Sequence, residues 1–174
     1  MKKILSLLFI SLLIVSCSAV KEKFLAGKKD KISEFSITKS LPNFRVENIN
    51  DETIVDSRTI IDRKKVNILI VITEWCPHCK KELPDIERFY TDYKDKVELT
   101  VIYSNDRTTK ERVKIFDTSH NFSFKRYFDK YNEAYVTFAV KKYPSNYIIQ
   151  NGTFVKIDNP VTYEKLVEIF SKIK

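Results

Sequence analysis

Hydrophobic and polar positions follow two different periods along this chain, one typical of strands and one typical of helices. Residues 66–73 form a nearly continuous apolar run rich in β-branched side chains, the pattern of a central strand that is covered on both faces. In residues 77–93 the apolar positions instead recur at intervals of three and four, which predicts an amphipathic helix. We therefore expect a buried strand that leads directly into a helix.

The rest of the chain continues this alternation. Strands are predicted at 97–103, 122–128, 145–149 and 153–157, and helices at 108–117, at 132–140 and from Pro160 onward. Residues 44–46 and 53–55 have the composition of a short hairpin, and Asn151-Gly152 predicts a two-residue turn between the last two strands. Because strands and helices alternate, we expect an α/β fold with a central mixed sheet, partly parallel and flanked by helices, and an N-terminal β-hairpin.

The first residues have the pattern of an export signal. Lys2 and Lys3 precede an apolar stretch over residues 4–15, which ends at Ser16 and Cys17. This stretch resembles the signal peptide of bacterial lipoproteins, which is cut before a cysteine that then carries diacylglycerol. An uncleaved membrane anchor is the alternative, although about a dozen apolar residues are short for a span of about 20. Both interpretations place the domain outside the cytoplasm.

Three segments follow from this interpretation. We expect residues 1–16 to be a lipoprotein signal peptide, and residues 17–40, which are polar and lysine-rich, to be the lipidated cysteine and a flexible tether. Residues 41–174 then have the length of one ordinary domain.

The charge of the chain changes this picture little. There are 31 Lys and Arg against 23 Asp and Glu, a formal net charge of +8. The basic residues are scattered rather than gathered into one run, so nucleic acid is not a predicted partner. A basic surface close to anionic lipid headgroups fits an anchored protein better.

Candidate chemistry lies at the junction of strand and helix, in the sequence Trp75-Cys76-Pro77-His78-Cys79. The N-terminus of a helix carries partial positive charge and unpaired N–H groups, which favour the thiolate of Cys76. Cys79, three positions later, can then resolve a mixed disulfide. Pro77 supplies a helix-compatible φ angle, and a protonated His78 adds positive charge beside the sulfur.

The other interpretation of such a pair is half of a zinc site. Zinc takes about four protein ligands, and the sequence contains three cysteines and two histidines. With Cys17 assigned to the lipid, a zinc set would need His78 or His120 together with carboxylates. A redox dithiol, which requires no metal and no other cofactor, explains the motif better.

The order of elements resembles the thioredoxin fold over residues 41–174. Within that fold, the lipoprotein-type N-terminus, the sequence LPNF at 41–44 and the sequence CKKELP at 79–84 resemble the TlpA/ResA group. Members of this group are membrane-anchored extracytoplasmic thiol-disulfide oxidoreductases. The resemblance implies that Cys76 is the exposed nucleophile and Cys79 the resolving thiol.

The same resemblance implies roles for three further residues. Glu82 would assist proton transfer beside the thiols, the alternative being an ordinary exposed carboxylate. Pro144 would be a cis-proline opposite the dithiol, the alternative being a trans proline at a strand start. Tyr143 would shape a substrate groove, in which an extended client peptide pairs with the backbone. Apart from the resemblance, we expect Trp75 to lie in the core or to line this groove rather than to hold a cofactor.

Motif and scaffold differ in the direction of electron flow that they indicate. The TlpA/ResA scaffold favours a reductase, whereas the sequence Cys-Pro-His-Cys is that of the DsbA oxidases, and potentials in this fold run from about −270 to −120 mV. Because the scaffold covers more of the chain, we expect a reductase that acts on protein substrates and is recycled by a membrane redox partner. The alternative function is a Cu(I) metallochaperone using Cys76 and Cys79 with His120, as in the Sco-like relatives of this fold, although those carry CxxxC.

Overall fold

The apolar run in the first half of the chain forms the central strand of a sheet. In the computed structural model, which describes residues 39–173, this strand is β4 (Val66–Ile72), and all of its residues except the first are buried. On one side it pairs in parallel with β5 (Val97–Ser104), and on the other it pairs antiparallel with β7 (Ser145–Gln150). The strand is therefore central and covered on both faces, as its composition predicted.

Eight strands make up the sheet, in the order β1-β8-β7-β4-β5-β6-β2-β3. Beyond β5 lies β6 (Lys125–Asp129), which is parallel to it, and then the hairpin of β2 (Arg45–Asn48) and β3 (Ile54–Asp56). At the opposite edge, β8 (Thr153–Ile157) pairs with β7 and with the two-residue β1 (Lys39–Ser40). The sheet is thus mixed, with its parallel pairs at the centre.

Both predicted hairpins are confirmed. Val46 pairs with Val55 in the hairpin of β2 and β3. Asn151 and Gly152, between β7 and β8, have positive φ angles of 53° and 74°. A two-residue turn with positive φ at both positions matches the right-handed twist of the two strands that it joins.

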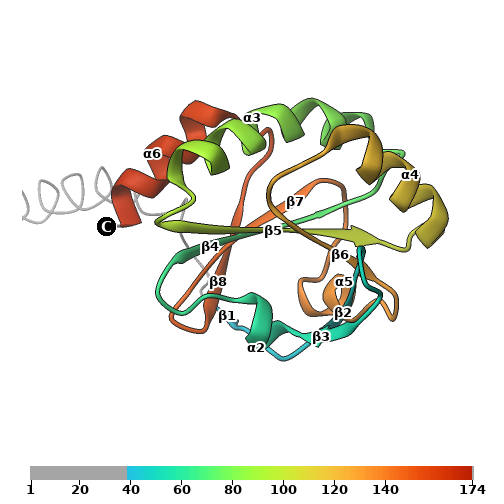
Figure 1. Ribbon diagram of the computed structural model, residues 1–174. Helices are drawn as coiled ribbons and strands as arrows, with labels where there is room; N and C mark the ends of the chain where they lie inside the picture. Colours follow the sequence, from blue (N-terminus) through green and yellow to red (C-terminus); the bar gives the residue numbers. More distant parts are fainter. Residues whose placement is uncertain (1–38, 174) are drawn as a thin grey trace, which may run out of the picture. The chain divides into compact units, whose positions relative to one another are not determined.

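Helices cover the two faces of the sheet unequally (Figure 1). Three longer helices, α3 (Pro77–Tyr93), α4 (Lys110–His120) and α6 (Tyr163–Ile173), lie on one face. The short helices α2 (Ser57–Ile60) and α5 (Glu133–Thr137) lie on the other. Each face has its own apolar cluster, and alternate residues of β4 contribute to the two clusters, since side chains alternate between the faces of a strand.

Some boundaries differ from those expected. The last helix does not begin at Pro160 but at Tyr163, because Thr162 caps it: the Thr162 hydroxyl accepts a hydrogen bond from the Lys165 N–H at 3.3 Å. Helix α5 is shorter than predicted, β6 begins later, and α2 was not predicted. Strand β1 begins at Lys39, inside the segment expected to be a tether.

The predicted signal peptide and Cys17 lie outside the described residues. Within residues 39–173, no helix has both the length and the apolar character needed to cross a membrane.

Candidate active site

The two cysteines lie at the junction between β4 and α3. Cys76 is the N-cap residue of α3, with extended backbone (φ −76°, ψ 114°), and Pro77 follows in the first turn. The backbone N–H of Cys79 donates a hydrogen bond of 3.2 Å to Sγ of Cys76. The Cys76 sulfur therefore takes the place of a capping oxygen and lies at the positive end of the helix dipole. Both cysteines are free thiols.

Cys76 is buried, which corrects the expectation of an exposed nucleophile. Its exposed fraction is 3%, and that of Cys79 is 1%. Both belong to the apolar cluster beneath α3, and the partly buried Trp75 and Tyr143 pack against the same cluster. The prediction that Cys76 precedes the helix is confirmed. Its burial could not be predicted from the spacing of residues, because the two aromatic neighbours are 68 positions apart in the chain.

Trp75 is held by contacts from three directions. Its indole N–H donates a hydrogen bond of 2.9 Å to the carbonyl of Asp106. The guanidinium of Arg107 lies 3.9 Å from a ring centroid of the indole, a favourable cation–π distance. The ring of Tyr143 meets that of Trp75 edge to face, with centroids 5.9 Å apart. Trp75 and Tyr143 therefore lie side by side beside the dithiol.

The Tyr143-Pro144 peptide bond is cis, as predicted. Pro144 is buried and immediately precedes β7. The Tyr143 hydroxyl donates a hydrogen bond of 2.8 Å to Oγ of Ser104, at the end of β5. The loop before β7 is thereby tied to the centre of the sheet. A second cis bond, Asn159-Pro160, was not expected.

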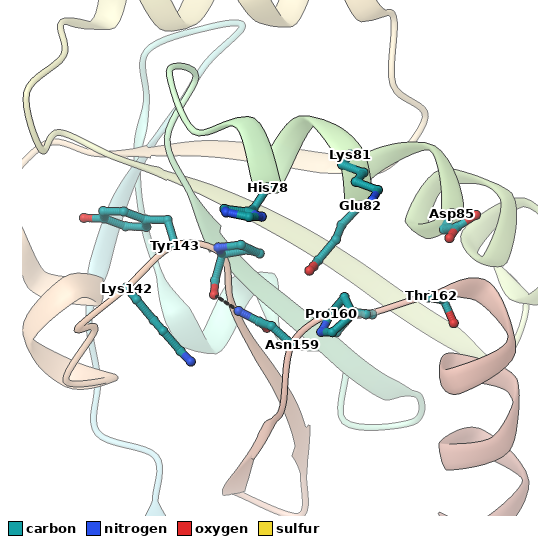
Figure 2. A pocket seen from close by; sticks show the side chains of 11 residues that line it. His78, Lys81, Glu82, Asp85, Lys142, Tyr143, Asn159, Pro160 and Thr162 are labelled. Atoms are coloured by element: carbon teal, nitrogen blue, oxygen red, sulfur yellow. Dashed lines mark hydrogen bonds between the residues drawn. The ribbon is translucent and has the colours of Figure 1, made fainter.

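A cavity of about 430 Å³ opens between the start of α3, the loop before β7 and the loop before α6 (Figure 2). It is lined by His78, Lys81, Glu82, Asp85, Lys142, Tyr143, Pro144, Asn159, Pro160, Val161 and Thr162. Four residues named from the sequence, His78, Glu82, Tyr143 and Pro144, therefore share one cavity. Ionisable side chains of both signs and apolar proline rings line the same space.

Glu82 is buried in the wall of this cavity, with an exposed fraction of 6%. Its Oε2 accepts a hydrogen bond of 3.3 Å from Nδ2 of Asn146 on β7. Burial raises the pKa of the Glu82 carboxyl, while hydrogen bonds from the Val161 backbone and from Asn146 and the charges of His78 and Lys165 oppose the rise. A carboxyl in this environment can exchange protons closer to neutral pH than an exposed one.

The environment of Cys79 keeps its thiol protonated. Burial is the main cause that raises the pKa of Cys79, and the hydrogen bond with Cys76 and the charges of Cys76 and Glu82 raise it further. Cys79 must therefore lose its proton to a nearby base before it can attack a disulfide, because the thiolate is the nucleophile.

Comparison with known proteins identifies the family. Residues 37–157 match the AhpC/TSA family. The chain belongs to the AhpC/TSA family. A relative in Bacillus thuringiensis subsp. konkukian, thiol-disulfide oxidoreductase ResA, is 29% identical over 177 residues, which cover 99% of each chain. The sporulation thiol-disulfide oxidoreductase A of Bacillus subtilis is 30% identical over 63% of this chain and 69% of its own.

Solved structures give the fold of this AhpC/TSA-family chain. StoA from Bacillus subtilis superposes with a TM-score of 0.58 and 23% identity, covering 74% of this chain and 96% of its own. The exposed lipoprotein thioredoxin of Streptococcus pneumoniae superposes with a TM-score of 0.64 and 14% identity, covering 75% of this chain and 99% of its own. The thioredoxin-like fold is thus confirmed. The relatives named above confirm the prediction of a thiol-disulfide oxidoreductase similar to the TlpA/ResA group.

His120 does not join the dithiol. It is the last residue of α4, is exposed, and stacks on Phe122 with ring centroids 5.2 Å apart. Within residues 39–173 there is no group of three or more His, Cys, Asp or Glu side chains placed to hold a metal ion. The three-ligand copper site of the metallochaperone alternative is therefore not assembled in the described part of this AhpC/TSA-family chain.

Sequence reasoning missed two polar residues near Glu82, of which Asn146 contacts the carboxylate and Asn159 contacts Asn146. Asn146 lies on β7 and Asn159 in the loop before α6, and the two amides are hydrogen-bonded to each other at 2.7 Å. The available signal was an asparagine inside the predicted strand 145–149, because an amide that a central strand buries requires hydrogen-bond partners.

Proposed function

We propose that this chain is a lipid-anchored, extracytoplasmic thiol-disulfide oxidoreductase that exchanges disulfides with protein substrates through Cys76 and Cys79. The observation that carries the proposal is the capping contact between the two cysteines, in which one sulfur accepts a hydrogen bond at the helix N-terminus and the other thiol is buried within the first turn. Whole-chain similarity to a thiol-disulfide oxidoreductase supports the same chemistry.

In the reductase direction, the thiolate of Cys76 attacks one sulfur of a client disulfide. A bond forms between Cys76 and that sulfur, the client disulfide breaks, and the second client sulfur leaves as a thiolate and takes a proton from the solvent. The Cys79 thiol then loses its proton and attacks Sγ of Cys76. The new Cys76–Cys79 disulfide releases the remaining client thiolate, which is protonated in turn, so the client gains two electrons and two protons.

Glu82 is the base that we assign to Cys79. It lies three positions further along α3, so both side chains lie on one face of the helix. Its burial raises the pKa of its carboxyl toward that of a useful proton acceptor, and its charge is one of the causes that raise the pKa of Cys79. In the reverse, oxidising direction the same carboxyl returns the proton.

The substrate groove is assigned to the cavity beside the dithiol. Tyr143 and Pro144 line this cavity. Trp75 does not line it but meets the ring of Tyr143 edge to face. Backbone at the start of β7 is available for an extended client segment, while His78 adds an imidazole at the exposed start of α3. We assign recycling of the dithiol to a membrane redox partner on the same side of the membrane.

Anchoring is proposed from the N-terminal sequence alone. The basic start, the apolar stretch and Ser16-Cys17 support processing as a lipoprotein, with diacylglycerol on the Cys17 sulfur. Expression of the full chain and of Cys17→Ser in a bacterium fed a clickable fatty acid tests this. We expect label in the parent and none in the variant; equal labelling of both would contradict the anchor.

The direction of electron flow is tested by a redox titration of the Cys76/Cys79 couple against glutathione or dithiothreitol. We propose a reductase, so the potential is expected nearer to thioredoxin, at about −270 mV, than to DsbA, at about −120 mV. Reduction of a disulfide-bonded model protein by the reduced chain tests the activity itself, with Cys76→Ala/Cys79→Ala as the inactive control. A double variant that reduces the model protein as fast as the parent would remove the dithiol from the reaction.

A further inference from the structure

A series of side-chain amides links the backbone carbonyl before β7 to Glu82 in the wall of the cavity. Nδ2 of Asn159 donates a hydrogen bond of 2.6 Å to the carbonyl of Pro144, which is the dashed line in Figure 2. Oδ1 of Asn159 accepts a hydrogen bond of 2.7 Å from Nδ2 of Asn146. The same Nδ2 reaches Oε2 of Glu82 at 3.3 Å. Four residues from α3, β7 and the loops before β7 and α6 are therefore linked in one series.

The direction of every bond in this series follows from its first member. A backbone carbonyl only accepts hydrogen bonds, so Asn159 must present its NH₂ group to Pro144. Its oxygen then faces Asn146, which must present its own NH₂ group in return. The second hydrogen of that NH₂ group is left for Glu82. An amide has two N–H donors, and here both are used.

The opposite orientation of Asn146 is disfavoured by its neighbours. Rotating this amide by half a turn would place its oxygen against Oδ1 of Asn159 and Oε2 of Glu82. All three oxygens are acceptors, so no hydrogen would lie between them unless the carboxyl is protonated. In the observed orientation, Oδ1 of Asn146 is buried and has no hydrogen-bond partner. A buried acceptor without a partner costs free energy, so the bonds made by the NH₂ group must hold the amide in place.

From this geometry we propose that Asn146 and Asn159 are positioning residues for the proton acceptor of the dithiol. Asn146 holds Glu82 in the carboxylate form that can receive a proton from Cys79. Asn159 acts through Asn146, by fixing the direction of its amide. The inference rests on the proposed function for the identity of the reaction, but the orientation of the amides rests on the hydrogen bonds alone.

Other charged and titratable groups act on Glu82 or line the same cavity, and they are common to every variant in the test. Around the cavity they are His78, Cys79, Lys81 and Asp85 on α3, Lys142 in the loop before β7, and Lys165 on α6. None of these groups is altered when an asparagine is replaced. A change in the titration of Glu82 that appears on replacing Asn146 or Asn159 therefore reports the amide series.

The test is an NMR titration of the Glu82 carboxyl in the full folded domain with ¹³C-labelled glutamate, the signal being assigned by its loss in Glu82→Gln. Asn146→Ala removes the donor to the carboxylate, so the Glu82 midpoint should rise. Asn159→Ala touches no atom of Glu82, yet it should also raise the midpoint, because the freed Asn146 amide can rotate and accept from the protonated carboxyl. In Asn146→Ala/Asn159→Ala the midpoint should equal that of Asn146→Ala alone.

Asn48→Ala is the matched control, because it removes an asparagine that bonds to a backbone N–H in the hairpin, at 2.9 Å from Asn50. It should leave the Glu82 midpoint unchanged. Asn146 is buried in the sheet, so if its variant fails to fold, Asn159→Ala decides by itself. An unchanged midpoint in Asn159→Ala overturns the proposal, as does a further rise in the double variant.

Exchange kinetics separate this inference from the proposed function. With the reduced chain and a disulfide-bonded model protein, the midpoint of the pH–rate profile should move upward in Asn159→Ala and should not move when the same change is made in Glu82→Gln. If the chain exchanges no disulfides but Asn159→Ala still shifts the NMR midpoint, the proposed function fails and the positioning role stands. If the chain exchanges disulfides but the NMR midpoint is unshifted, the positioning role fails and the proposed function stands.

Discussion

The sulfur of Cys76 accepts a hydrogen bond of 3.2 Å from the backbone N–H of Cys79. This contact places the two thiols in unequal environments, although both are buried. Cys76 lies before the helix, where the N–H of Cys79 points toward its sulfur, whereas Cys79 lies inside the first turn, where burial raises the pKa of its thiol. The two cysteines are therefore chemically distinct without any difference in exposure.

The first prediction assigns their roles from this asymmetry. Cys79→Ala should accumulate mixed disulfides between Cys76 and client proteins, because the first attack still occurs and nothing resolves the product. Cys76→Ala is the matched control and should accumulate none. Non-reducing gels and mass spectrometry of the trapped species measure this. Trapping by Cys76→Ala in place of Cys79→Ala would reverse the assignment.

The second prediction concerns His78, an exposed residue in the first turn of α3. Its imidazolium stabilises a neighbouring thiolate and hence the reduced form, so His78→Ala should make the couple more reducing, by about 30 mV for each 1.4 kcal/mol lost. His120→Ala is the control, since His120 stacks on Phe122 at the end of α4. The measurement is a redox titration of the parent and both variants. If all three have the same potential, the helix N-terminus and not His78 stabilises the thiolate.

The third prediction is that Glu82→Gln slows disulfide exchange and changes its dependence on pH. An amide cannot take the proton of Cys79, so the resolving step loses its base while the shape of the side chain is kept. Asp85→Asn removes a carboxylate from the same cavity and should have little effect. Stopped-flow rates from mildly acidic to mildly basic pH provide the measurement, and rates for Glu82→Gln equal to the parent throughout would make Glu82 a structural residue.

The fourth prediction concerns stability. Burial holds the pKa of Glu82 above its value in the unfolded chain, so the folded state binds the proton more tightly. Stability therefore decreases as pH rises through the window between the unfolded and folded pKa values, and above that window the full cost is present. Glu82→Gln lacks this cost, and its Oε1 can still accept from Asn146.

The free energy of unfolding of Glu82→Gln relative to the parent should consequently rise from acidic to neutral pH. Urea unfolding at a series of pH values measures the difference, with Asp85→Asn as the control for loss of a carboxylate at the cavity. A difference that falls with pH would mean that Glu82 is stabilised in its ionised form by the fold.

Features that depend on residues close together in the chain could be predicted from the sequence. The β-branched run at 66–72 predicted the central strand, since such side chains fit a strand covered on both faces. The three- and four-residue spacing after Cys76 predicted α3, and Asn151-Gly152 predicted the turn between β7 and β8. Motif order was also sufficient to indicate the family, because the dithiol occupies a fixed place between a strand and a helix.

The surroundings of the dithiol depend instead on contacts between segments that are distant in the chain. Cys76 is buried by residues from several elements. The contact of Trp75 with Tyr143 joins two segments that are distant in the chain. The hydrogen bond between Glu82 and Asn146 does the same, across 64 positions. Local periodicity identifies which face of an element is buried, but not which side chain of another element meets it. The pKa of a buried carboxyl depends on those partners, so the chemistry of Glu82 is a property of the folded chain.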